Sequence, residues 1–206
     1  LGNDIAAEYI HDKFIEYGLE NVTYQNFTVV DCIDHGANIT ILSSDNLSPI
    51  RIYPMLPNLV CPSTTPPEGI KGRLIYARKG SLEDFEKGAK EADADVEGSI
   101  VILDWNSQYN WINAAKLGAK AVVFIQPSPE VPNIYLMKGW TAEKYLVNVP
   151  FNFPRFYVEE SGAKELLAHV GEEARIVSIQ RWEHLTGRNV LGFLEGKGYE
   201  GSVIDG

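Results

Sequence analysis

The stretch GSIVILDWNSQYNWINAAKLGAKAVVFIQ, residues 98–126, contains one βαβ unit. Residues 100–103 and 121–125 are continuous apolar runs rich in β-branched side chains, a pattern typical of strands that are covered on both faces. Between them, residues 111–117 suit a helix that crosses from one strand to the next. The unit predicts a sheet that contains parallel strands, with a right-handed crossover.

The ends of this helix and the positions of three others follow from apolar spacing and capping residues. Asn110 is placed to cap the first turn of the crossover helix, and Gly118 to end it in the left-handed conformation. Ser161 is expected to begin the last helix, where its hydroxyl can accept a hydrogen bond from a free backbone amide. The further helices are predicted over residues 4–17, 81–95 and 161–170.

Short strands with turns between them account for most of the remaining chain. The predicted strands cover residues 22–27, 28–33, 38–42, 50–53, 73–76, 175–180 and 188–194. Together with the helices they predict a mixed α/β (α+β) fold. A chain of 206 residues can bury the core of one domain with appended segments, but it is too short for two full domains.

Composition excludes several classes of protein. Eighteen basic and 28 acidic residues give a formal net charge of −10, which disfavours nucleic acid as a partner. No apolar run approaches the roughly 20 residues that span a bilayer, so no transmembrane segment is predicted in this chain. Anything upstream that exported or anchored the protein would lie outside it.

Two features of the first third of the chain bear on its compartment. Cys32 and Cys61 are the only cysteines, and the sequence leaves open whether they are reduced thiols or one disulfide. The glycosylation sequons that begin at Asn21, Asn26, Asn38 and Asn46 are clustered there as well. The clustering mildly favours an exported or cell-surface protein.

The order of segments resembles two known families. GSIVILD (98–104), NAAKLGAKAVVFIQ (113–126) and VNVPFNFPRFYVEESGAKELL (147–167) resemble the protease-associated domain. The flanks NDIAAEYIHDKFIEYGLENVTYQNF (3–27) and RNVLGFLE (188–195) resemble the start of M28-family zinc aminopeptidases and carboxypeptidases, in which such a domain can be inserted.

The resemblance implies a division of the chain and a type of sheet. Residues 1–28 would be the first helix and strand of the peptidase domain, 29–183 the protease-associated domain, and 184–206 the return strand and the start of a truncated catalytic domain. The protease-associated domain would contain a mixed, open, barrel-like sheet with a few flanking helices.

The resemblance also implies that the catalytic chemistry lies beyond Gly206. In the M28 family, the strand after a segment like NVLGFLEG is followed by one that ends in His-x-Asp and supplies the first metal ligands. Residues 202–204 would be that strand here. We therefore expect no catalytic residue, metal ligand or cofactor in this chain, and two zinc ions in the missing catalytic domain.

Two groups of side chains within the chain could suggest chemistry of their own. Asp31, Asp34 and His35 are metal-ligand types, but alternation along a strand would place Asp31 and His35 on one face and Asp34 on the other. Ser161 and Lys164 match a Ser-x-x-Lys spacing without its partner motifs. Neither group predicts an active site, so we do not expect an enzyme that acts with its own residues.

Five residues are candidate contacts to a substrate or partner: Trp105, Tyr109, Tyr135, Trp140 and Arg155. In glutamate-releasing relatives, the loop after the GSIVILD-like strand carries basic residues, whereas here DWNSQYN (104–110) carries none. The resemblance therefore favours neutral amino acids or dipeptides as substrates.

Two functions remain open from the sequence. The first is a non-catalytic lid that roofs the active site of an M28-type exopeptidase and shapes the access of short peptides. Its partners would be its own catalytic domain, short peptides and a second copy in a homodimer. The alternative is a self-sufficient module that binds peptides or proteins through the aromatic loop 127–147.

Overall fold

The computed structural model describes residues 2–43, 46–55, 62–125 and 152–196. The chain divides into two compact units, with residues 1–31 and 183–206 in unit 1 and residues 32–182 in unit 2. Two long strands, β1 (Glu20–Ile41) and β7 (Glu173–Phe193), contribute to both units. Tyr135 and Trp140, the aromatic loop, Cys61 and the expected strand at 202–204 all lie outside the described residues.

Unit 2 is built on a mixed sheet. The strands β2 (Ile50–Pro54), β3 (Ile70–Tyr76), β4 (Ile100–Asp104), β5 (Ala121–Ile125) and β6 (Arg155–Val158) join β1 and β7 in the hydrogen-bonded order β1-β2-β6-β5-β4-β3-β7. Neighbours from β3 through β4 and β5 to β6 are parallel, and the pairs β1–β2, β2–β6 and β3–β7 are antiparallel.

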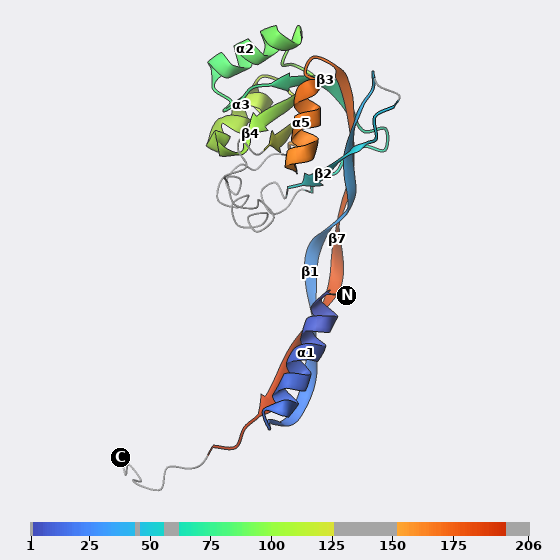
Figure 1. Cartoon of the computed structure of the whole chain (residues 1–206), viewed down its shortest axis with the longest axis vertical. Coiled ribbons are helices and arrows are strands. Elements are labelled where there is room, and N and C mark those ends of the chain that lie inside the picture. The colour runs from blue at the N-terminus through green and yellow to red at the C-terminus, as the bar shows by residue number, and fades with distance from the viewer. Residues whose placement is uncertain (1, 44–45, 56–61, 126–151, 197–206) are drawn as a thin grey trace, which may run out of the picture. The chain divides into compact units, whose positions relative to one another are not determined.

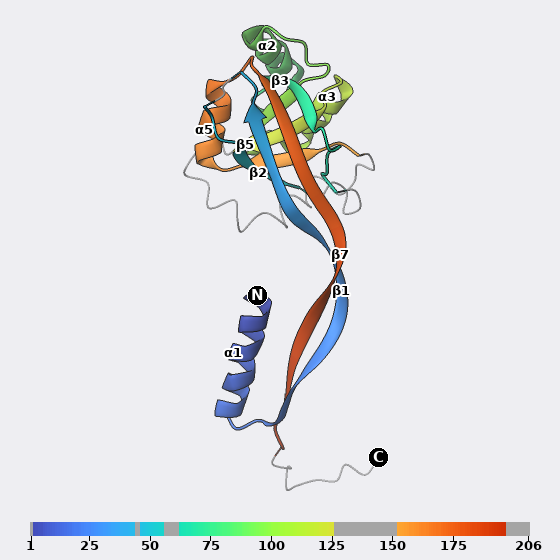
Figure 2. The ribbon, with the colours of Figure 1, turned by 90° about the vertical axis from the view of Figure 1, so that its right-hand side faces the viewer.

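The first and last strands of this order, β1 and β7, lie next to each other. The backbone N–H of Leu42, just after β1, donates to the carbonyl of Glu173 at 2.8 Å, and Figures 1 and 2 show β1 and β7 side by side. The sheet is therefore barrel-like, and the predicted mixed α/β fold is confirmed.

Helices on the two faces of the sheet bury two separate cores. The helix α5 (Glu160–Ala168) packs Ala163 and Leu166 into the first core, which contains alternate residues of the strands. The helices α2 (Leu82–Ala92) and α3 (Trp111–Lys116) pack Phe85 and Trp111 into the second core, on the opposite faces of β4 and β5. Burial on both faces explains why β4 and β5 are apolar throughout.

The predicted βαβ unit is confirmed, with one correction. The register pairs Ile100 with Ala121 and Asp104 with Ile125, and Gly118 has the expected left-handed φ of 82°. However, a 3₁₀ segment, η1 (Trp105–Asn110), runs directly into α3, and the Asn110 side chain makes no capping bond. Asn110 itself has helical backbone angles, φ −65° and ψ −17°, and not the extended ones of a capping residue, and its Nδ2 donates to the carbonyl of Lys79 at 2.9 Å.

Three further predictions on element boundaries are wrong. Strands expected separately at 22–27, 28–33 and 38–42 form one strand, β1, and those at 175–180 and 188–194 form one strand, β7. Gly36 has a φ of 126°, a conformation that glycine adopts without strain, and β1 continues through it to Ile41. The last helix begins after Glu159, which places Ser161 inside the first turn and not at the cap.

Unit 1 contains α1 (Gly2–Glu16) with the first part of β1 and the last part of β7. A Cβ at Gly192 would lie 3.1 Å from the Phe14 ring and 2.7 Å from the Leu19 side chain, so α1 and the loop after it pack closely on β7. Arg188 donates to the Asn26 side chain across the strands at 3.3 Å. Among the described residues, no helix is long and apolar enough to cross a membrane.

Candidate functional site

Six aromatic side chains form a layer on the second core of unit 2. Tyr53 stacks on Tyr157 with their ring centres 4.9 Å apart, and Trp105 meets the Tyr157 ring edge-on at 6.4 Å. Trp105 also contacts Phe124, and Trp111 stacks on Phe153 at 6.3 Å. We call this set the aromatic layer: Tyr53, Trp105, Trp111, Phe124, Phe153 and Tyr157.

One cation is buried against this layer. Arg155 opens β6, where its backbone N–H donates to the Ser63 hydroxyl at 3.3 Å and its carbonyl accepts from Met55 N–H at 2.9 Å. Because side chains alternate along a strand, Arg155 and Tyr157 lie on the face of the second core. The guanidinium carbon of Arg155 lies 3.9 Å from the centre of the Trp111 ring, and the residue has no exposed surface.

Among the residues that the structure describes, the Arg155 guanidinium has no polar partner. Its Nε, Nη1 and Nη2 atoms are buried and make no hydrogen bond to any residue that the structure describes. Burial lowers the pKa of Arg155 to about 10, so the side chain keeps its charge at neutral pH. An anion that reached these nitrogens would therefore meet a charged, water-excluded donor.

Tyrosine hydroxyls near the layer are held by carboxylates. Tyr53 donates to Glu159 at 2.5 Å, and this bond, with burial as the second cause, raises the pKa of Tyr53 to about 12. Tyr76 donates to the buried Asp104 at 2.8 Å. Burial, followed by this bond, raises the pKa of Tyr76 as well. These tyrosines stay neutral at physiological pH and act as hydrogen-bond donors.

The η1 segment carries two of the candidate contacts and an unusual backbone. Trp105 is half-buried in the aromatic layer, whereas Tyr109 is 50% exposed. Gln108 adopts φ 52° and ψ −126°, a conformation that usually requires glycine. The hydroxyl of Ser107 is buried and makes no hydrogen bond within the described chain.

The structure thus brings Trp105 and Arg155 to the same core and leaves Tyr109 on the surface. Their roles in binding remain predictions. Trp111 and Tyr157, which the sequence alone presents as ordinary core residues, are the contacts that define the surroundings of Arg155 and Trp105. For Trp111, the only indication in the sequence is its place as the first residue of the predicted crossover helix.

The groups weighed as sites in the sequence do not assemble into one. Asp34 accepts from Gly36 N–H and from Arg51, at 2.8 Å and 2.5 Å. Lys164 pairs with Glu160 one turn earlier on the same helix, and not with Ser161. Within the described part of the chain, no three metal-ligand side chains are close enough to hold an ion.

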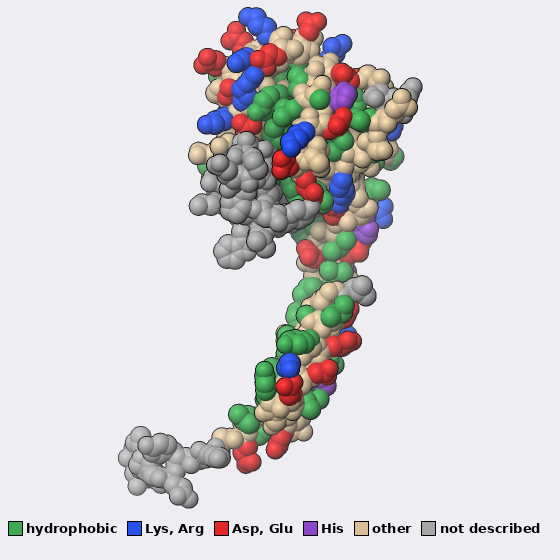
Figure 3. Space-filling model, in the orientation of Figure 1, with side chains coloured by type: hydrophobic (Ala, Val, Ile, Leu, Met, Phe, Trp, Pro, Cys, Tyr) green, Lys and Arg blue, Asp and Glu red, His purple; other side chains and the backbone are tan. Residues whose placement is uncertain are grey.

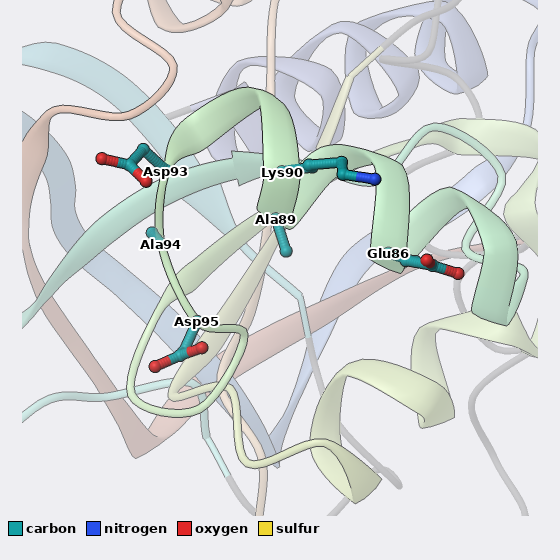
Figure 4. Close-up of a pocket in the computed structure, with 6 residues that line it drawn as sticks. All are labelled: Glu86, Ala89, Lys90, Asp93, Ala94 and Asp95. Atoms are coloured by element: carbon teal, nitrogen blue, oxygen red, sulfur yellow. The ribbon is translucent and has the colours of Figure 1, made fainter.

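An open pocket on α2 is also acidic, but its carboxylates diverge. It is lined by Glu86, Ala89, Lys90, Asp93, Ala94 and Asp95. Figure 4 shows Glu86, Asp93 and Asp95 pointing in different directions, which is the arrangement of a solvated surface and not of a metal centre.

A second candidate surface lies on unit 1, where large apolar side chains are exposed. Figure 3 shows hydrophobic side chains at the surface along α1. Ile5 and Tyr9, one turn apart on α1, are 61% and 63% exposed. We call the exposed apolar side chains of unit 1, which lie on more than one of its faces, the unit 1 apolar surface: Ile5, Tyr9, Ile10, Ile15, Tyr17, Phe27, Val29, Val30, Leu191, Phe193 and Leu194.

Comparisons with solved structures identify proteins of the same fold. Two structures of BSAP, a zinc aminopeptidase from Bacillus subtilis, match 95% and 96% of this chain with TM-scores of 0.59 and 0.56 and 18% and 17% identity. A Peptidase M28 precursor from Shewanella amazonensis SB2B matches 91% of the chain with a TM-score of 0.52 and 14% identity. The chain shares its fold with part of these peptidases.

The match covers less than half of each peptidase. The chain spans 42% of the BSAP chain and 44% of the Shewanella chain. No family model matches the sequence, and no curated protein matches it. The likeness is therefore one of fold, and it extends over nearly the whole described chain.

Proposed function

We propose that this chain is the non-catalytic, protease-associated part of an M28-type zinc exopeptidase. In this proposal unit 2 roofs the active site and shapes the access of short peptides, and two zinc ions belong to a catalytic domain encoded after Gly206. The single observation that carries the proposal is the fold likeness to BSAP over 95% of this chain and only 42% of BSAP. The rest of such a peptidase would be the partner of this chain.

The unit 1 apolar surface supports the same proposal. Ile5 and Tyr9 are exposed side by side on α1, and exposed apolar patches on soluble proteins usually mark an interface with another domain or protein. In a longer protein, the catalytic domain would cover this surface. In the isolated chain the surface would remain open, and we expect it to drive homodimer formation.

A comparison of the isolated chain with the longer gene product tests the function. The longer product should bind two zinc ions and release single amino acids, whereas residues 1–206 alone should do neither. Replacing residues 32–182 of the longer product by a short Gly/Ser linker should retain hydrolysis of a small chromogenic aminoacyl substrate and relax the preference for short peptides. Stoichiometric zinc or turnover in the isolated chain would refute the proposal, as would an unchanged length preference after the replacement.

The interface is tested separately, by sedimentation of the isolated chain. The double variant Ile5→Ser, Tyr9→Ser should shift the chain toward monomer. A matched control is Leu82→Ser, which removes a side chain that is 67% exposed on unit 2. Equal effects of the two variants would show that self-association does not use the unit 1 apolar surface.

Substrate preference and compartment follow as parts of the same proposal. Residues 104–110 contain no Lys or Arg, which favours neutral amino acids at the position that this segment faces. The four clustered sequons lead us to propose an exported or cell-surface protein. Glycosidase treatment of protein from the native host would show a mass shift if the sequons are used.

A further inference from the structure

Within the described part of unit 2, Arg155 differs from the ring-stacked arginines Arg51 and Arg78 in having no carboxylate partner. Arg51 lies over Tyr53 at 4.7 Å and pairs with Asp34, and Arg78 lies over Tyr76 at 5.2 Å and pairs with Glu91. Arg155 lies closer to its ring than either of them, at 3.9 Å, and is the only one of the three that is fully buried. Buried charges in folded proteins are paired, because an isolated buried ion is very unfavourable.

The geometry of Arg155 determines which kind of group its guanidinium can bind. The Trp111 ring covers one face of the planar guanidinium, so the ring supplies no hydrogen bond to Nε, Nη1 or Nη2. The N–H groups of these nitrogens lie in the guanidinium plane, where they form a fork that matches the two oxygens of a carboxylate. Aromatic stacking holds the fork in place before the anion arrives.

We infer that Arg155 binds a peptide carboxylate at the aromatic layer of unit 2. Trp111 would orient the guanidinium, and the other rings of the layer would contact the apolar part of the ligand. The inference rests on the proposed function for the identity of the ligand as a short peptide. It adds the requirement that the peptide carries a carboxylate at one position. The cation that binds this carboxylate comes from β6 and not from the segment 104–110.

The experiment uses the chain of residues 1–206 and three small probes, so it does not depend on zinc or on hydrolysis. N-acetyl-leucine carries an α-carboxylate, N-acetyl-leucinamide carries none, and N-acetyl-glutamic acid 1-amide carries only a side-chain carboxylate. Binding is followed by the chemical shift of the Trp111 indole and by calorimetry. At least one of the two carboxylates should bind at least tenfold more tightly than the neutral amide.

The two carboxylate probes distinguish the source of the anion. Preference for N-acetyl-leucine indicates a free peptide C-terminus, and preference for the glutamic acid 1-amide indicates an acidic side chain. Both results support the site. Equal binding of all three probes, or no binding of either carboxylate at a concentration on the order of 10 mM, would overturn it.

Variants assign the effect to Arg155. Arg155→Met should lose the carboxylate preference by at least tenfold, and Arg155→Lys should retain part of it, because a lysine keeps the charge but not the fork. Arg51→Met is the matched control, since it removes a ring-stacked arginine that already has a carboxylate partner, and it should bind like the wild type. If Arg155→Met fails to fold, Arg155→Lys decides, and wild-type affinity in either folded variant would contradict the inference.

Discussion

The close packing of α2 on β3 predicts that Gly88→Ala destabilises unit 2. A Cβ at Gly88 would lie 2.4 Å from the carbonyl oxygen of Tyr76, about 1 Å closer than ordinary contact, and 3.1 Å from the Ile75 side chain. Tyr76 is paired with Ile102 in the sheet, so its carbonyl cannot move aside without disturbing β4. The helix would have to retreat instead.

Two opposing effects set the size of the change. Alanine is a better helix former than glycine by about 1 kcal/mol in the interior of a helix. Retreat of α2 by about 1 Å would lift Phe85, which is 1% exposed, off the second core, and overpacking of this kind costs about 1–3 kcal/mol. Since the clash is with backbone and is severe, we expect a net loss of about 2 kcal/mol.

The assay is urea unfolding followed by circular dichroism, with Lys87→Ala as the control. Lys87 is exposed on the same helix, and its replacement should change the free energy of unfolding by less than about 0.5 kcal/mol. The slope of the transition with urea should stay the same, because both variants expose the same surface on unfolding. A Gly88→Ala variant as stable as the control would refute the packing argument.

Three further predictions concern unit 2. Ser81→Ala should lower the free energy of unfolding by about 1 kcal/mol, because Ser81 forms a capping box at α2, and Ser161→Ala should change it by less than about 0.5 kcal/mol. Hydrogen bonding to Glu172 raises the pKa of His169 above its ordinary 6.5, so its stabilisation is complete below that pH and is lost as the pH rises through the folded-state pKa. His169→Gln should therefore destabilise more at about pH 6 than at about pH 9, as measured by urea unfolding at both pH values. Gln108→Gly should raise the melting temperature by relieving about 1 kcal/mol of backbone strain, and an unchanged value would contradict this.

The sequence predicts those parts of the fold in which local pattern and tertiary burial agree. The strands at 100–104 and 121–125 were predictable because both faces are covered and both are apolar. The ends of β1 and β7 were not, because a strand's length depends on its partner. Gly36 has the appearance of a strand end, yet the chain continues through it.

The candidate site was predictable only in part, for a similar reason. The sequence singles out Arg155 as a cation between aromatic residues, but it does not show on which face of the sheet the side chain lies. The register of Arg155 with Val122 places it in the second core, and Trp111 reaches it from a helix more than 40 residues earlier in the chain. Both the strand register and the contact with Trp111 join residues that are far apart in the sequence, so the local sequence pattern could not predict either of them.

Three of the polar and backbone anomalies of unit 2 lie in η1 and β6, next to Trp111 in the chain or in contact with its ring. The η1 segment, which runs directly into Trp111, contains the strained Gln108 and the buried Ser107 hydroxyl, which makes no hydrogen bond to the residues that the structure describes. β6 supplies Arg155, whose guanidinium lies on the same ring. Sequences that otherwise satisfy local and global requirements tend to violate them at functional sites, where strain and unpaired polar groups serve a ligand. Three such violations beside one buried tryptophan make this the place in unit 2 where we propose to test for binding, and not the acidic pocket on α2, whose carboxylates point in different directions.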